Sequence, residues 1–65
     1  MVIKVVEIIG SSPKSWEDAA NAAVNEAAKT IRGIIGVDLM NFTATVKDGK
    51  IVMYKACCKI AFEVE

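Results

Sequence analysis

The order of apolar and polar positions predicts a first strand at the start of the chain. Residues 2–9 are rich in β-branched side chains and apolar except for Lys4 and Glu7, and they are followed by the turn-forming Gly10-Ser11-Ser12-Pro13. Both the even and the odd positions of this run are mainly apolar. We therefore expect a strand that is covered on both faces.

The next segment has the pattern of a helix that begins at Ser15, continues to about residue 32 and stops at Gly33. The Ser15 hydroxyl is suited to cap the free amide groups of the first turn, and Glu17 and Asp18 suit the positive end of the helix dipole. Apolar residues recur at spacings of three and four, which predicts a stripe that packs on the strands. The residues of this stripe are Trp16, Ala20, Ala23, Ala27 and Ile31.

Two further strands are predicted after a short apolar connector at residues 33–36. Residues 37–46 alternate, with Met40, Phe42, Ala44 and Val46 on one side and Asn41, Thr43 and Thr45 on the other. Asp48-Gly49 is typical of a hairpin turn. Residues 51–64 then form a long strand with an unbroken apolar even face: Val52, Tyr54, Ala56, Cys58, Ile60, Phe62 and Val64.

The lengths of these elements indicate that one chain cannot complete its own core. A helix of about 18 residues is roughly 27 Å long, whereas a strand of about 14 residues is roughly 46 Å long. Because one helix cannot cover that apolar face from end to end, the remainder must be buried against other copies. The pattern predicts a single α+β domain over residues 1–65, with β-α-β-β order, that works as a homo-oligomer.

Composition supports assembly over the other ways to stabilise so short a chain. A chain of 65 residues is near the lower limit for independent folding, because it buries only about 60% of its unfolded surface. Cys57 and Cys58 are adjacent in a strand and point to opposite faces, so they cannot join distant parts of the chain. The chain has no His, and its two Cys lack zinc-site spacing. It is also 54% hydrophobic, with a mean hydropathy of +0.40.

Charge and targeting patterns argue against several classes of partner. The 8 basic and 8 acidic residues balance, so no net field attracts nucleic acid or an anionic membrane. No apolar run approaches the roughly 18 to 20 residues of a membrane span, and the amino terminus lacks the pattern of a signal peptide. Two thiols without a secretion signal favour the cytosol. We expect a cytoplasmic protein with no nucleic-acid or membrane partner.

Candidate chemistry is sparse. The absence of His removes the ordinary general-base and Ser-His arrangements, so an enzyme is not expected. Most reactive or aromatic residues have structural interpretations. Ser11, Ser12 and Ser15 are interpreted as turn and cap residues. Cys57 and Cys58 are interpreted as ordinary strand residues, with a redox role as the alternative. Trp16 and Phe42 are interpreted as core anchors in preference to a platform that stacks on nucleic-acid bases. Glu17 and Asp18 leave a Ca²⁺ site open, although no twelve-residue calcium loop is present.

Several stretches, in this order and at this chain length, resemble the dodecin family. They are residues 2–10 (VIKVVEIIG), 12–19 (SPKSWEDA), 28–32 (AKTIR), 48–51 (DGKI) and 60–65 (IAFEVE). The resemblance spans nearly the whole chain without gaps. It implies a three-stranded antiparallel sheet wrapped on one helix, with twelve copies forming a hollow shell. It also implies non-catalytic binding, storage or sequestration of a flavin, either FMN or riboflavin, or of a related small ligand.

The resemblance further implies a cofactor-binding site at Gly36 and Lys55, lined by Ile35, Val37 and Thr45. The family usually has a Trp that stacks on the flavin ring where this chain has Gly36, and a Gln that pairs with the ring edge where it has Lys55. Stacking is worth roughly 0.5–1.5 kcal/mol per aromatic pair, and Lys donates hydrogen bonds but cannot accept them.

These two departures motivate an alternative function for the same architecture. In it, a dodecin-like shell binds no flavin and holds a metal ion such as calcium, an anion, or nothing. The metal ligands are not specified by the sequence. The available oxygen ligands are Glu17, Asp18, Glu63 and Glu65.

Overall fold

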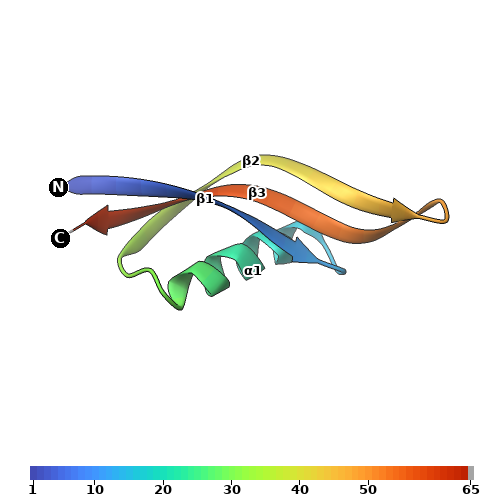
Figure 1. Cartoon of the computed structure of the whole chain (residues 1–65), viewed down its shortest axis with the longest axis horizontal. Helices are drawn as coiled ribbons and strands as arrows, with labels where there is room; N and C mark the ends of the chain where they lie inside the picture. The colour runs from blue at the N-terminus through green and yellow to red at the C-terminus, as the bar shows by residue number, and fades with distance from the viewer. Residues whose placement is uncertain (65) are drawn as a thin grey trace.

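The computed structural model describes residues 1–64 and consists of one sheet packed on one helix (Figure 1). The elements follow in the order β1 (Val2–Ser12), α1 (Trp16–Ala28), β2 (Ile34–Lys47) and β3 (Lys50–Val64). β3 lies in the middle of the sheet and pairs antiparallel with β1 on one side and β2 on the other. The predicted α+β class, the β-α-β-β order and the antiparallel sheet wrapped on one helix are confirmed.

The connection from β1 to α1 is fixed by two serine side chains. The Ser15 hydroxyl accepts a hydrogen bond from the Asp18 amide at 2.9 Å and caps the helix as predicted. Ser12 is buried, and its hydroxyl donates to Asp18 Oδ2 at 2.6 Å and accepts from the Lys14 amide at 3.0 Å. Ser11 is not in the turn as predicted. It belongs to β1, because β3 is long enough to pair with the chain as far as Ser12.

The helix is shorter than predicted and ends at Ala28 instead of continuing to about residue 32. The Lys29 amide bonds the carbonyl of Glu26 at 3.2 Å, and the Thr30 amide bonds that of Ala27, also at 3.2 Å. Bonds between residues three apart tighten the last turn and end the α-helix. The chain then turns through Gly33, whose φ is +75° and whose carbonyl accepts from the Glu63 amide at 2.9 Å.

β2 begins earlier and is less regular than predicted. Ile34 already pairs with Phe62, so the predicted connector at 33–36 is wrong except for Gly33. The register shifts at three places along β2, which leaves Ile35 and Met40 without a partner on β3. Because a bulge inserts an extra residue into one strand, it interrupts the alternation of faces. Met40 therefore does not share a regular row with Phe42 as predicted.

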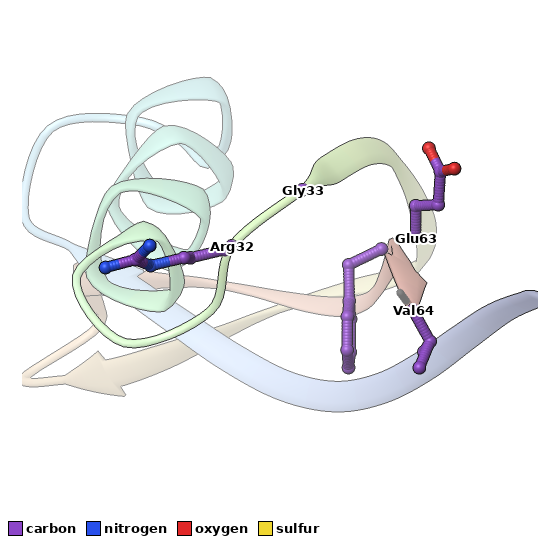
Figure 2. Close-up of a pocket in the computed structure, with 5 residues that line it drawn as sticks. Arg32, Gly33, Glu63 and Val64 are labelled. Carbon is purple, nitrogen blue, oxygen red and sulfur yellow. The ribbon is translucent and has the colours of Figure 1, made fainter.

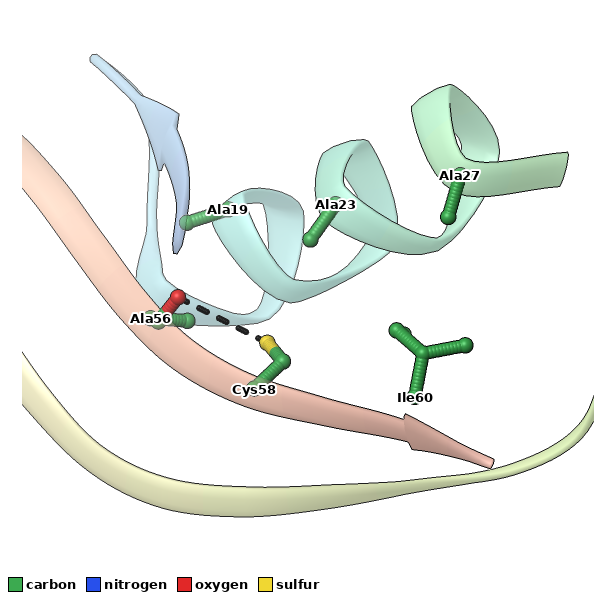
Figure 3. Packing of buried hydrophobic residues seen from close by; sticks show 6 residues of the cluster. All are labelled: Ala19, Ala23, Ala27, Ala56, Cys58 and Ile60. Atoms are coloured by element: carbon green, nitrogen blue, oxygen red, sulfur yellow. Dashed lines mark hydrogen bonds between the residues drawn. The ribbon is translucent and has the colours of Figure 1, made fainter. Parts of the chain in front are cut away.

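The core lies between the helix and the middle of β3 (Figure 3). The apolar even face of β3 is confirmed there, where its central side chains point at three alanines of α1. The buried hydrophobic residues of this core are Ala19, Ala23, Ala27, Ala56, Cys58 and Ile60. The helix stripe is thus rotated from the prediction, with Ala19 buried in place of Ala20. A Cβ on Gly10 would collide with the Ala19 carbonyl and approach the Ala23 Cβ to 2.8 Å, so glycine permits this close contact of helix and sheet.

The sheet extends well beyond the helix at both ends (Figure 1). The molecule is 48 Å long, while 13 helical residues span only about 20 Å. Within one chain, β1 is covered on one face only, so the predicted cover of its second face would have to come from other copies. The large apolar residues left exposed include Ile3, Val5, Ile9, Val37, Leu39, Phe42, Val46, Ile51, Val52 and Val64.

Candidate functional site

The predicted ligand positions lie mainly on the side of the sheet that the helix does not cover. Ala56, Cys58 and Ile60 face the helix, and successive strand side chains alternate in direction. The odd positions of β3 and the residues paired with them therefore form the opposite surface, which we call the open face. Its β3 members are Met53, Lys55, Cys57, Lys59 and Ala61.

Lys55 is half-buried at the centre of the open face, because β3 is flanked by strands on both sides. Its cross-strand neighbours are Ser11 on β1 and Thr43 on β2. Directly opposed Cβ atoms are about 4.5–5.5 Å apart in such pairs. Thr45, which is opposite Met53, is on the same face one row away. The structure thus brings the predicted residues Lys55 and Thr45 together, and it adds two hydroxyls that the sequence did not identify.

Gly36 is on the open face but distant from Lys55 within one chain. It pairs with Ala61, six positions from Lys55 along β3, which corresponds to about 20 Å. A Cβ on Gly36 would have no heavy atom within 4 Å, so this position is spacious. Ile35 occupies the adjoining irregularity, and Val37 pairs with Ile60 on the helix side. One chain does not gather the five predicted positions, and their role as a single site stays a prediction.

An aromatic group anchors β2 close to Lys55. The Trp16 indole Nε1 donates to the Thr43 carbonyl at 2.8 Å. Its ring makes edge-on contacts with Tyr54 and Phe42, at centroid distances of 4.7 and 6.5 Å. Trp16 and Phe42 were predicted to be core anchors, but in one chain they are 38% and 48% exposed and lie outside the buried core. The helix start thereby fixes the main chain of the residue opposite Lys55.

Two shallow depressions are lined by other residues. One of about 380 Å³ is lined by Arg32, Gly33, Phe62, Glu63 and Val64 at the end of the sheet (Figure 2). In that view the Arg32 guanidinium and the Glu63 carboxylate point away from each other. The other, of about 460 Å³, is lined by Glu7, Ile8, Ile9 and Cys57. Neither lining includes Gly36 or Lys55.

The acidic residues available for calcium are not gathered within one chain. Glu17 is at the start of α1, whereas the main chain of Glu63 bonds to Gly33, which follows the end of that helix. Glu65 is outside the described residues. Asp18 accepts the hydrogen bond from Ser12. Among residues 1–64, no three His, Cys, Asp or Glu side chains cluster closely enough to hold a metal ion. A calcium site built from these residues would need more than one copy of the chain.

The two cysteines differ in environment. Cys58 is fully buried, and its thiol donates to the Ala56 carbonyl at 3.5 Å (Figure 3). Burial raises the pKa of the Cys58 thiol above its ordinary value of 9.0, and the adjacent Cys57 adds to the effect. Because the thiolate is the reactive form, burial and the raised pKa make the Cys58 thiol less reactive than an exposed one.

None of the helices in the described part of the chain is long and apolar enough to cross a membrane.

Known proteins of the same architecture match this chain over nearly its full length. The chain is 32% identical to the calcium dodecin of Mycobacterium tuberculosis over 63 residues, 97% of this chain and 89% of that protein. It is 28% identical to the dodecin of Thermus thermophilus over 64 residues, 98% of this chain and 93% of that protein.

Among solved structures, the dodecin of Streptomyces coelicolor superposes with a TM-score of 0.96 at 25% identity, covering 98% of this chain and 91% of the other. The family model for dodecin matches residues 2–65. With the same order of elements, the same sheet and a match that spans the chain, this protein belongs to the dodecin family.

Proposed function

We propose that this chain is the subunit of a cytoplasmic homododecameric shell that binds and stores a small ligand and catalyses no reaction. The observation that carries the proposal is the full-length dodecin match of a chain that leaves large apolar residues exposed at both ends of its sheet. Burial of such residues against further copies would supply the stabilisation that a 65-residue chain otherwise lacks.

The first candidate ligand is a flavin, FMN or riboflavin. Gly36, Lys55, Ile35, Val37 and Thr45 are the positions that would contact it. Because Gly36 and Lys55 are about 20 Å apart along one sheet, a compact site that uses both must combine residues from at least two copies. A symmetric shell would bring residues of different copies together at the contacts between its subunits.

Titration of the purified assembly with riboflavin and FMN tests this function. Binding should quench flavin fluorescence at micromolar protein, and an absence of quenching with both flavins would rule out the flavin store. The variant Gly36→Trp should bind both flavins more tightly than the natural chain, and the double variant Gly36→Trp, Lys55→Gln should bind riboflavin more tightly. A Cβ on Gly36 would meet no heavy atom within 4 Å in one chain, and each stacked aromatic pair contributes roughly 0.5–1.5 kcal/mol.

The second candidate is a shell that binds calcium in place of a flavin. It is favoured by the 32% identity to a protein named calcium dodecin, and by carboxylates that are exposed at Glu17, Asp18 and Glu63. Such a site would combine oxygen ligands of neighbouring copies. Calorimetry with Ca²⁺ should then give a binding heat, and Ca²⁺ should raise the unfolding temperature of the assembly. If neither is seen, the calcium function is excluded.

A further inference from the structure

Two lysines on the open face of β3 have opposite surroundings. Lys59 lies between Glu7 on β1 and Asp38 on β2, so an acid flanks it on each side. Lys55, four positions away on the same face, lies between Ser11 and Thr43. The register thus places a carboxylate on each side of Lys59, although neither forms an ion pair with it within one chain, and only hydroxyls beside Lys55.

The neutral surroundings of Lys55 extend beyond its direct partners. The positions that are diagonal to it or next along the strand on the open face are Ile9, Asn41, Thr45, Met53 and Cys57. Glu7 and Asp38 are four positions away, roughly 13 Å along the strand, which exceeds the screening length of about 8 Å at physiological ionic strength. Within residues 1–64 the only ion pair joins Lys29 to Glu26. Lys55 is therefore a half-buried cation that forms no ion pair among the described residues.

A half-buried charge is costly unless it is paired, and the neighbours of Lys55 define the partner that fits. The ammonium group offers three donors, and the Ser11 and Thr43 hydroxyls each offer one more. Five donors around one positive charge match an anion with several acceptor oxygens, because charge-assisted bonds to such oxygens are the strong ones. A flavin ring edge, which both donates and accepts, would be paired incompletely by lysine.

We propose that Lys55, Ser11 and Thr43 form an oxyanion site on the open face, and that the ligand of this shell carries a phosphate group. The inference rests on the proposed ligand-binding function and narrows it to phosphorylated compounds, with FMN as the probe and riboflavin as its unphosphorylated counterpart. Trp16 supports the site by fixing the Thr43 main chain.

Calorimetric titration of the wild-type assembly with inorganic phosphate is the first test, and phosphate should bind. Lys55→Gln should weaken that binding about tenfold or more, because it removes a charged hydrogen-bond partner. Lys59→Gln is the matched control, on the same face of the same strand, and should leave phosphate binding within about threefold. Lys55→Arg should retain the site, and Thr43→Val should weaken binding less than Lys55→Gln does.

A comparison of FMN with riboflavin tests whether the phosphate group that binds at Lys55 belongs to a flavin. FMN should bind about tenfold or more tightly than riboflavin, and the difference should vanish in Lys55→Gln. Equal binding of both flavins with no phosphate binding would overturn the oxyanion site while leaving the flavin store standing. Lys55-dependent phosphate binding without flavin binding would support the site and reject the flavin store.

A third outcome is that Lys55 pairs with a carboxylate of a second copy. Phosphate would then not bind the wild type, and Lys55→Gln would lower the mass of the assembly in solution. That result would overturn the proposal. Circular dichroism of each variant confirms that the comparison is made between folded proteins.

Discussion

The middle of the sheet and its hairpin end contain similar side chains but have different surroundings. In the middle, Ile60 is fully buried beneath the alanine face of α1. At the hairpin, where β2 and β3 extend past the helix (Figure 1), Val46 is 62% exposed and Ile51 47% exposed. The sequence is apolar in both regions, yet one chain covers only the first.

This difference shows that the apolar pattern of the sequence extends over more of the sheet than one chain covers. A 13-residue helix covers about 20 Å of a sheet whose long axis is 48 Å. The even face of β3 stays apolar past both ends of the helix. We interpret the hairpin as surface that the assembly buries, and the middle as the core that each chain forms alone.

The largest expected effect comes from shortening one apolar side chain in each region. Ile60→Ala removes fully buried atoms and should lower the free energy of unfolding by about 2–5 kcal/mol. Val46→Ala should cost about 1–2 kcal/mol if the assembly buries the hairpin, against less than about 0.5 kcal/mol for an exposed residue. Urea unfolding at one fixed protomer concentration measures both, with the exposed Asn25→Ala as control. A negligible cost at Val46 would show that the hairpin stays bare.

A methyl group added to a glycine distinguishes the crowded middle from the open end of the sheet. In Gly10→Ala the new Cβ would meet the Ala19 carbonyl and the Ala23 Cβ, so we expect a loss of about 1–3 kcal/mol from overpacking. Gly36→Ala is the matched control, because its Cβ would have nothing within 4 Å. Thermal unfolding should show a clear decrease in Tm only for the first variant. Equal decreases would mean that the helix does not rest on Gly10.

The buried thiol of the middle should contribute a smaller effect that depends on pH. Because the pKa of Cys58 is raised above 9.0 in the folded chain, the unfolded thiol loses its proton first as the pH increases. The stability that the buried thiol contributes is present below about pH 9 and declines above it, by less than about 1.4 kcal/mol per pH unit.

Urea midpoints at pH 8 and pH 10 measure that decline. The decline in stability should be smaller in Cys58→Ala than in the wild type. Ile60→Val, a nearby core change that keeps the thiol, should show the full decline. If Cys58→Ala and the wild type decline equally, the buried thiol has no part in the alkaline loss of stability.

Most of the fold could be predicted from local patterns. Alternation identified the long strand β3, the Asp48-Gly49 turn identified the hairpin, and the Ser15 cap identified the helix start. The helix end could not be predicted, because residues 29–32 continue the helical pattern of the sequence. The change to bonds between residues three apart at Lys29 and Thr30, and the bond between Gly33 and Glu63 on distant segments, leave no local signal.

The surroundings of Lys55 could not be predicted for a similar reason. Counting back from the hairpin, where Lys47 is opposite Lys50, would place Thr43 opposite Tyr54. The register shift between Thr45 and Val46 moves Thr43 to Lys55. Such a shift is decided by pairing across the sheet. The pairing of β3 with β1, which places Ser11 beside Lys55, likewise leaves no signal in the local sequence. Family resemblance indicated Lys55 as a ligand position, but only the register shows its neutral, hydroxyl-rich neighbours beside the acid-flanked Lys59.

The mass of the natural protein in solution tests the central claim most directly. With a subunit of 7.0 kDa, a twelve-subunit shell has a mass of about 84 kDa, twelve times the subunit mass. Sedimentation equilibrium at micromolar protein, with circular dichroism on the same sample, should find that mass for the folded protein. A folded, stable monomer of 7.0 kDa under those conditions would contradict the claim that this chain needs other copies to complete its core.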